Sequence, residues 1–132
     1  MHDGTGSAWP VQSKATYWNA SAVDVGYGCH TNYHCVPVME GKYGGTGWLS
    51  QTSYRVDQFH RFTYVSVQFN DSYSTTAAEK AEAVCHELGH VAGLGYESSN
   101  VSCMNAVADG THEYASNDDF DQLAYHTYNG TT

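Results

Sequence analysis

Residues 86–96 read HELGHVAGLGY and are the most informative stretch of the chain. His86 and His90 are four residues apart, so on a helix both imidazoles project from one face and can hold one Zn²⁺ ion. Glu87 points beside such a metal, where a carboxylate can take a proton from zinc-bound water and pass it to a leaving amine. The spacing therefore predicts a zinc site with Glu87 as general base and acid. An ordinary polar helix face is the competing interpretation, because so short a pattern also occurs by chance.

The residues before this stretch predict the helix that it needs. Thr76, or Thr75 beside it, is a suitable N-cap, and Glu79 lies three residues beyond Thr76 as the other member of a capping box. The helix is expected to run from Ala77 to about Gly93, where a glycine can end it. Four residues at three- and four-residue steps are expected to form its buried stripe: Ala81, Val84, Cys85 and Leu88.

The rest of the chain predicts strands and loops, with one further helix. A strand is predicted over residues 62–69, FTYVSVQF, because one of its alternating faces is more apolar than the other, and it ends in the turn residues 70–72. Residues 15–20, ATYWNA, favour a strand, and closely spaced glycines divide residues 26–47 into short extended pieces, so no helix is expected in the first half. A last helix, capped by Ser116 or Asn117, is expected near the end of the chain.

This pattern resembles the metzincin clan of zinc endopeptidases, in particular its small secreted matrixin-like type. Four residues match the extended motif of that clan: His86, Glu87, His90 and Gly93. Residues 102–105, SCMN, are similar to its Met turn, in which Met104 would pack beneath the two histidines. The similarity covers roughly residues 62–128, and the first sixty residues resemble the family only loosely.

The resemblance implies one α+β domain of the zincin-like (metzincin) fold over residues 1–132, with a twisted mixed sheet, an active-site helix and a C-terminal helix. It implies a zinc-dependent endopeptidase that acts on a protein or peptide substrate. Bound peptide in this family pairs with the strand ahead of the active-site helix, so residues 64–69, or the stretch just before them, are expected to form the substrate edge. A central, packed strand is the alternative. The long N-terminal helix of the family is not evident between residues 18 and 38.

The third ligand position of the motif departs from the family. It is normally His and sometimes Asp, and it is Tyr96 in this chain. Tyr96 can bind zinc as a phenolate, because a zinc ion can lower the phenol pKa from about 10. Alternatively a residue of the following loop completes the site, with four candidates: Glu97, Asp109, His112 and Glu113. In the remaining alternative only two ligands are present and the site is impaired, by nature or by engineering.

Four cysteines in a small domain with few charges indicate a compartment in which disulfides persist. They allow three pairings, and the preferred one joins Cys29 to Cys35 and Cys85 to Cys103. Residues 29–35 form a short loop that can close on itself, and a zinc knot that uses the histidines of that loop is the alternative. The second disulfide would tie the expected ligand helix to the Met turn.

Composition limits the partners of the chain. Five Lys and Arg against fourteen Asp and Glu give a net charge of −9, so no basic stripe is present to bind nucleic acid or an anionic membrane. Residues 1–6 have neither the positive segment nor the apolar core of a signal peptide, so the protein is either cytosolic or has lost its export signal. We expect the second, a secreted, extracellular mature form that is a monomer. Four glycosylation sequons matter only if the source glycosylates its proteins: Asn19, Asn70, Asn100 and Asn129.

A second hypothesis comes from another functional class. A catalytically impaired or non-catalytic domain of the zincin fold would bind a protein or glycan through exposed Tyr and Trp residues. The aromatic content of 14% is compatible with such a surface. Cleavage that depends on Glu87 would favour the enzyme.

Overall fold

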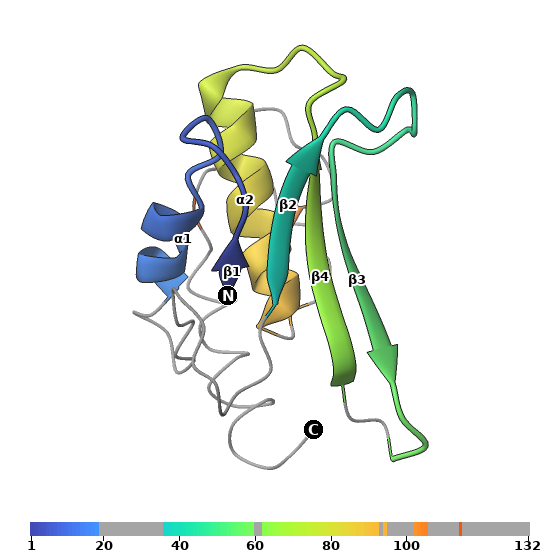
Figure 1. Ribbon diagram of the computed structural model, residues 1–132. Helices are drawn as coiled ribbons and strands as arrows, with labels where there is room; N and C mark the ends of the chain where they lie inside the picture. Colours follow the sequence, from blue (N-terminus) through green and yellow to red (C-terminus); the bar gives the residue numbers. More distant parts are fainter. Residues whose placement is uncertain (19–35, 60–61, 93, 95–101, 106–113, 115–132) are drawn as a thin grey trace.

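The structure is a computed structural model that describes residues 1–18, 36–59, 62–92, 94, 102–105 and 114 (Figure 1). These residues contain, in chain order, β1 (His2–Asp3), α1 (Val11–Trp18), β2 (Pro37–Gly41), β3 (Ser50–Val56), β4 (Phe62–Asn70) and α2 (Ala77–Val91). The expected last helix, capped by Ser116 or Asn117, lies outside the described residues.

The four strands form one mixed sheet in the order β1-β2-β4-β3. β1, β2 and β4 are parallel, and β3 pairs antiparallel with β4. Val67 of β4 lies beside Val38 of β2 on one side and beside Thr52 of β3 on the other. Within the described part of the chain β4 is therefore a central strand and β3 an edge. The prediction of an α+β fold with a mixed sheet is confirmed at this level.

Both helices lie on the same side of the sheet, and α2 runs antiparallel to β4 (Figure 1). α2 contacts both α1 and β3. The core forms between this helix and the sheet, where Val67, Phe69 and Leu88 are fully buried. Trp9 stacks on Phe69 with ring centroids 4.5 Å apart, so the residues before α1 extend the same core.

α2 begins where the sequence predicts. The Thr76 side chain accepts a hydrogen bond from the Glu79 backbone N–H at 3.1 Å, and the Glu79 carboxylate accepts one from the Thr76 N–H at 3.3 Å. This reciprocal pair is the predicted capping box. The helix ends at Val91 with Ala92 as its C-cap, whereas Gly93 lies outside the described residues.

The buried face of α2 is wider than the predicted stripe. Val84, Cys85 and Leu88 are fully buried, as expected. Ala81 is only half-buried, whereas four residues outside the predicted stripe are buried: Glu82, Ala83, Glu87 and Gly89. α2 therefore buries a wider face than a single stripe, because it contacts α1 as well as the sheet.

The expectation that the first half contains no helix is wrong. Residues 15–18, which favour a strand by composition, form the second half of α1. The buried residues of this helix recur at helical spacing: Val11, Lys14, Ala15 and Trp18. Trp18 Nε1 donates to the backbone oxygen of Cys85 at 3.1 Å, so packing against α2 overrides the β propensity of the aromatic and β-branched residues.

Asn70, at the end of β4, organises the loop between β2 and β3. Its side chain is fully buried, and its Oδ1 atom accepts a hydrogen bond from the Tyr43 backbone N–H at 3.1 Å. Three acceptors lie within 3.0–3.4 Å of its Nδ2 atom: Gly44 O, Thr46 Oγ1 and Trp48 O. The sequon at Asn70 is therefore closed to a glycan in the folded chain.

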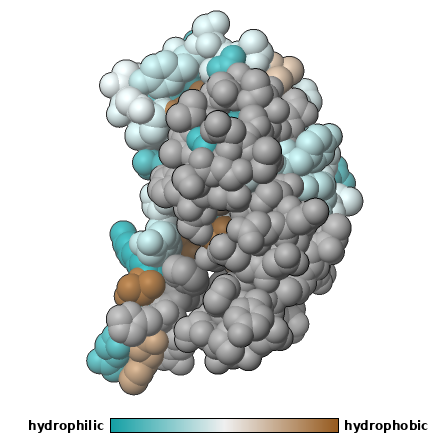
Figure 2. Space-filling model, turned by 180° about the vertical axis from the view of Figure 1, so that it is seen from behind, coloured by the Kyte–Doolittle hydropathy of each residue, from teal (hydrophilic) through white to brown (hydrophobic). Residues whose placement is uncertain are grey.

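The β3–β4 hairpin projects beyond the helices at one end of the sheet (Figure 1). Its far end exposes apolar side chains, with Val56 49% and Phe59 65% exposed. Figure 2 shows hydrophobic surface on this projection, at the lower left, and mostly polar surface over the other described residues. None of the described helices combines the length and the apolar character that crossing a bilayer requires.

Candidate functional site

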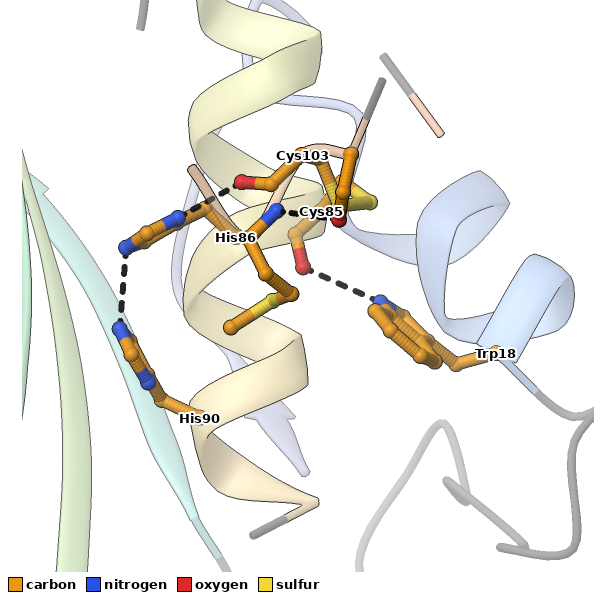
Figure 3. The surroundings of a disulfide bond; sticks show 7 residues. Trp18, Cys85, His86, His90 and Cys103 are labelled. Atoms are coloured by element: carbon orange, nitrogen blue, oxygen red, sulfur yellow. Dashed lines mark hydrogen bonds between the residues drawn. A yellow bond between two sulfur atoms is a disulfide. The ribbon is translucent and has the colours of Figure 1, made fainter. Parts of the chain in front are cut away.

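His86 and His90 lie on successive turns of α2, and their rings face each other. The two Nε2 atoms are 2.9 Å apart, and the rings are nearly perpendicular with centroids 4.5 Å apart (Figure 3). Both side chains are half-buried. The four-residue spacing in the sequence thus brings both imidazoles to one point, as helical geometry requires.

A backbone carbonyl fixes the outer nitrogen of each ring. His86 Nδ1 lies 2.7 Å from Cys103 O, and His90 Nδ1 lies 2.8 Å from Leu94 O. Because a carbonyl oxygen only accepts hydrogen bonds, each Nδ1 atom carries a proton. A neutral imidazole then has a lone pair on Nε2. At 2.9 Å the two Nε2 atoms are within hydrogen-bond distance, so either a proton on one ring or a metal cation between the rings satisfies both nitrogens.

These donors fit a zinc ion. Tetrahedral zinc with Zn–N bonds of about 2.0–2.1 Å places two ligand nitrogens about 3.3 Å apart, so the pair would open by only a few tenths of an ångström. A carbonyl that accepts from the other ring nitrogen is the usual second partner of a zinc-bound histidine. His86 and His90 therefore have the atoms, the tautomer and the approximate spacing that the metal needs.

The third ligand stays a prediction. Within the described part of the chain, no third His, Cys, Asp or Glu joins the histidine pair in a group that could hold a metal. Tyr96, the predicted ligand, lies outside the described residues, as do all four alternatives: Glu97, Asp109, His112 and Glu113.

Burial lowers the pKa of His86 below its usual value of 6.5. The negative charge of Glu87 and the hydrogen bond to the Cys103 carbonyl oppose this change, while the neighbouring His90 adds to it. The net effect favours the neutral imidazole, which is the form that binds a metal.

Glu87 is only 3% exposed and points toward the edge strand β3. Its Oε2 atom accepts a hydrogen bond from Ser50 Oγ at 2.7 Å, and its Oε1 atom accepts one from Thr52 Oγ1 at 2.8 Å. Neither hydroxyl residue is predicted from the sequence. Their alternation on a strand was visible in the sequence, but nothing in it links them to a glutamate on a helix beyond the next strand.

Met104 packs against the turn of α2 that separates the two histidines. It is fully buried, and its backbone N–H donates to Ser102 Oγ at 2.9 Å. A Cβ atom added at Gly89 would overlap Met104 Sδ and lie 3.1 Å from Trp18 Cζ2. The glycine therefore lets the segment with Met104 approach the helix closely, in a packing role rather than as a ligand.

A disulfide joins Cys85 to Cys103, as the sequence predicts. It links α2 to the segment that carries Met104, and closing a loop of 18 residues stabilises the fold by about 3 kcal/mol. The carbonyl of Cys103 is also the acceptor for His86 Nδ1 (Figure 3). The other predicted pair, Cys29 and Cys35, lies outside the described residues.

The expected substrate edge needs a correction. Residues 64–69 belong to β4, which has β2 on one side and β3 on the other, so this strand cannot pair with a peptide. Among the described strands the edge beside β4 is β3, which is not predicted from the sequence and which contacts Glu87. Strand alternation in the sequence does not reveal the order of strands in a sheet, because pairing is decided by the whole fold.

Comparison of the chain with protein-family profiles, curated proteins and solved structures found no match. The likeness to metzincins therefore depends on the motif residues alone.

Proposed function

We propose that this chain is a zinc-dependent endopeptidase that hydrolyses internal peptide bonds of proteins. The observation that carries the proposal is the 2.9 Å approach of two Nε2 atoms whose rings are both oriented by backbone carbonyls. The buried carboxylate of Glu87, on the same helix, supplies the base.

A zinc ion held by His86 and His90 would polarise the scissile carbonyl and lower the pKa of a coordinated water toward about 7. Peptide hydrolysis also requires that a proton of the attacking water be transferred to the leaving amine. Glu87 accepts it from the attacking water and delivers it to the nitrogen of the leaving amine. The carbonyls of Cys103 and Leu94 hold the rings so that both Nε2 atoms stay aimed at one point.

β3, an edge strand among the described residues, supports an extended peptide as the substrate. An edge strand offers backbone groups to a further strand, and a peptide paired with β3 would run past Glu87. The disulfide between Cys85 and Cys103 favours an oxidising, extracellular location. With a net charge of −9, the chain acts on protein rather than on nucleic acid or a membrane surface.

The second candidate is a zincin-fold domain that binds a partner without cleaving it. Exposed aromatic residues on the β3–β4 hairpin favour it, with Tyr54 62%, Phe59 65% and Tyr64 46% exposed. Aromatic side chains of this kind are enriched in protein interfaces.

The test measures bound zinc and casein cleavage in the same preparations. His90→Ala is expected to bind much less than one zinc ion per chain, because one of the two Nε2 ligands is removed. Glu87→Ala is expected to keep zinc while kcat/KM falls about 100-fold or more. His126→Ala, outside the motif, is the control and should change neither quantity. Cleavage that survives Glu87→Ala would falsify the mechanism, and a chain that takes up no zinc would leave only the binding domain.

The same preparations test Tyr96 as the third ligand. Adding Cu²⁺ to the metal-free chain is expected to produce a phenolate-to-metal absorption band, which Tyr96→Phe should abolish. If the Tyr96 phenolate is adapted as a ligand, Tyr96→His is expected to lower activity. If Tyr96 is a poor replacement for histidine, Tyr96→His is expected to raise activity. A band that persists in Tyr96→Phe would assign the position to another residue.

A further inference from the structure

Ser50 and Thr52 lie on one face of β3, because side chains two residues apart point to the same side of a strand. Ser50 Oγ donates to Glu87 Oε2 at 2.7 Å, and Thr52 Oγ1 donates to Glu87 Oε1 at 2.8 Å. Thr52 Oγ1 also lies 3.3 Å from the backbone oxygen of Glu87, but a hydroxyl has one proton and the shorter contact receives it. Each carboxylate oxygen therefore accepts one hydroxyl.

This pair of hydrogen bonds makes the burial of Glu87 tolerable. The side chain is 3% exposed, and burying an ionised carboxylate is costly unless it is hydrogen-bonded. Bonds to two different oxygens also fix the rotation of the carboxylate plane. A carboxylate has about four lone-pair positions, so positions remain at which Glu87 can accept a proton.

The sheet sets the position of both hydroxyls. Ser50 pairs with Phe69 of β4, and Thr52 pairs with Val67. Both partners are fully buried, so the pairing is anchored in the core. Gln51, between the two hydroxyl residues, points to the opposite face. A slip of one residue in this register would turn both hydroxyls away from α2.

We propose that Ser50 and Thr52 are positioning residues that hold the Glu87 carboxylate in the orientation needed for proton transfer. A general base must lie within hydrogen-bond reach of the proton that it takes, and small displacements cost large factors in rate. The effect on rate rests on the proposed peptidase function, whereas the contact itself is a property of the metal-free chain. The two parts can therefore be tested separately.

The kinetic test uses variants that keep the shape of the side chain. Thr52→Val removes the hydroxyl and is expected to lower kcat about 10- to 100-fold while KM stays within about twofold. Thr52→Ser restores the hydroxyl and should recover kcat to within about threefold. Ser50→Ala should lower kcat in the same way. Thr16→Ala, exposed on α1 and outside the proposed substrate strand, is the control and should leave kcat unchanged.

The structural test is a double-mutant cycle on the metal-free chain, followed by urea unfolding. Thr52→Val should increase the unfolding equilibrium constant in the wild-type background. In the Glu87→Leu background the same substitution should increase it by a factor about tenfold smaller. Ser53→Ala should give the same factor in both backgrounds.

Three results would overturn the inference. One is the absence of coupling in the cycle, and another is a Thr52→Val variant that changes KM while kcat is retained. The third is a Thr52→Ser variant that fails to recover kcat. A wild-type chain that shows the coupling but cleaves no peptide would overturn the peptidase, and with it the kinetic role. Missing coupling in an active chain would overturn the positioning role alone.

Discussion

Each described polar side chain of the candidate site has a hydrogen-bond partner outside α2. His86 contacts a carbonyl of the segment that carries Met104, and Glu87 contacts two hydroxyls of the edge strand. The partner of His90, the carbonyl of Leu94, lies just beyond the end of α2. These hydrogen bonds fix the orientations of the side chains, so the zinc ion and the peptide of the proposed function would have little reorganisation to impose.

Among the described glycines, Gly89 leaves the least room for a side chain. Gly89→Ala is expected to lower the free energy of unfolding by about 1–3 kcal/mol, although alanine favours a helix by about 1 kcal/mol over glycine. The reason is overlap of the new Cβ with Met104 Sδ, next to Trp18, both of which are fully buried. Urea unfolding measures the change. Gly45→Ala, where an added Cβ meets no atom within 4 Å, is the control, and an equal loss there would contradict the packing role.

The two helices show what the sequence could predict and what it could not. The start of α2 and the meeting of its histidines follow from local rules, since a capping box and a four-residue spacing act within one helix. α1 was missed because its aromatic and β-branched residues favour a strand, while its buried stripe from Val11 to Trp18 is stabilised by contacts with α2. Ser50 and Thr52 could not be assigned to Glu87 for the same reason: their contact depends on how the sheet and the helix pack.

The contact between α1 and α2 can be tested at the indole of Trp18. Trp18→Phe keeps an aromatic ring but removes the donor to the Cys85 carbonyl and some buried volume. The expected loss in unfolding free energy is about 1–3 kcal/mol. Thr16→Ala, on the exposed face of the same helix, should stay within about 0.5 kcal/mol of the wild type. Thermal unfolding that shifts equally in both variants would show that α1 does not depend on this contact.

Three stretches far apart in the sequence meet at the candidate site: β3, α2 and residues 102–105. The disulfide fixes one of these junctions covalently, and sheet pairing sets the position of another.

Residues 4–9 are joined to the ends of the strands at a different place. There Glu40 accepts a hydrogen bond from the Gly6 backbone N–H, and Asp71 accepts one from Trp9 Nε1 at 2.9 Å.

This second junction gives the fold a pH dependence of its own. The hydrogen bond from Gly6 alone would lower the pKa of Glu40, but burial and the neighbouring Asp71 carboxylate outweigh it and raise that pKa above its usual value of 4.5. The folded chain thus binds this proton more tightly than the unfolded chain. The resulting stability is fully present below the unfolded pKa, and it is lost as pH rises through the folded pKa.

Glu40→Gln removes this titration and keeps an oxygen that can accept from Gly6. The stability of the wild type relative to Glu40→Gln is therefore expected to fall as pH is raised from about 4 to about 7. Urea unfolding of both chains across this range measures the difference. Because the whole chain carries a net charge of −9, the series should be repeated in high salt, which screens general repulsion between exposed charges more than the contact between two neighbouring carboxylates. A difference that stays constant with pH, or that grows as pH rises, would show that Glu40 is not destabilised by ionisation in the folded state.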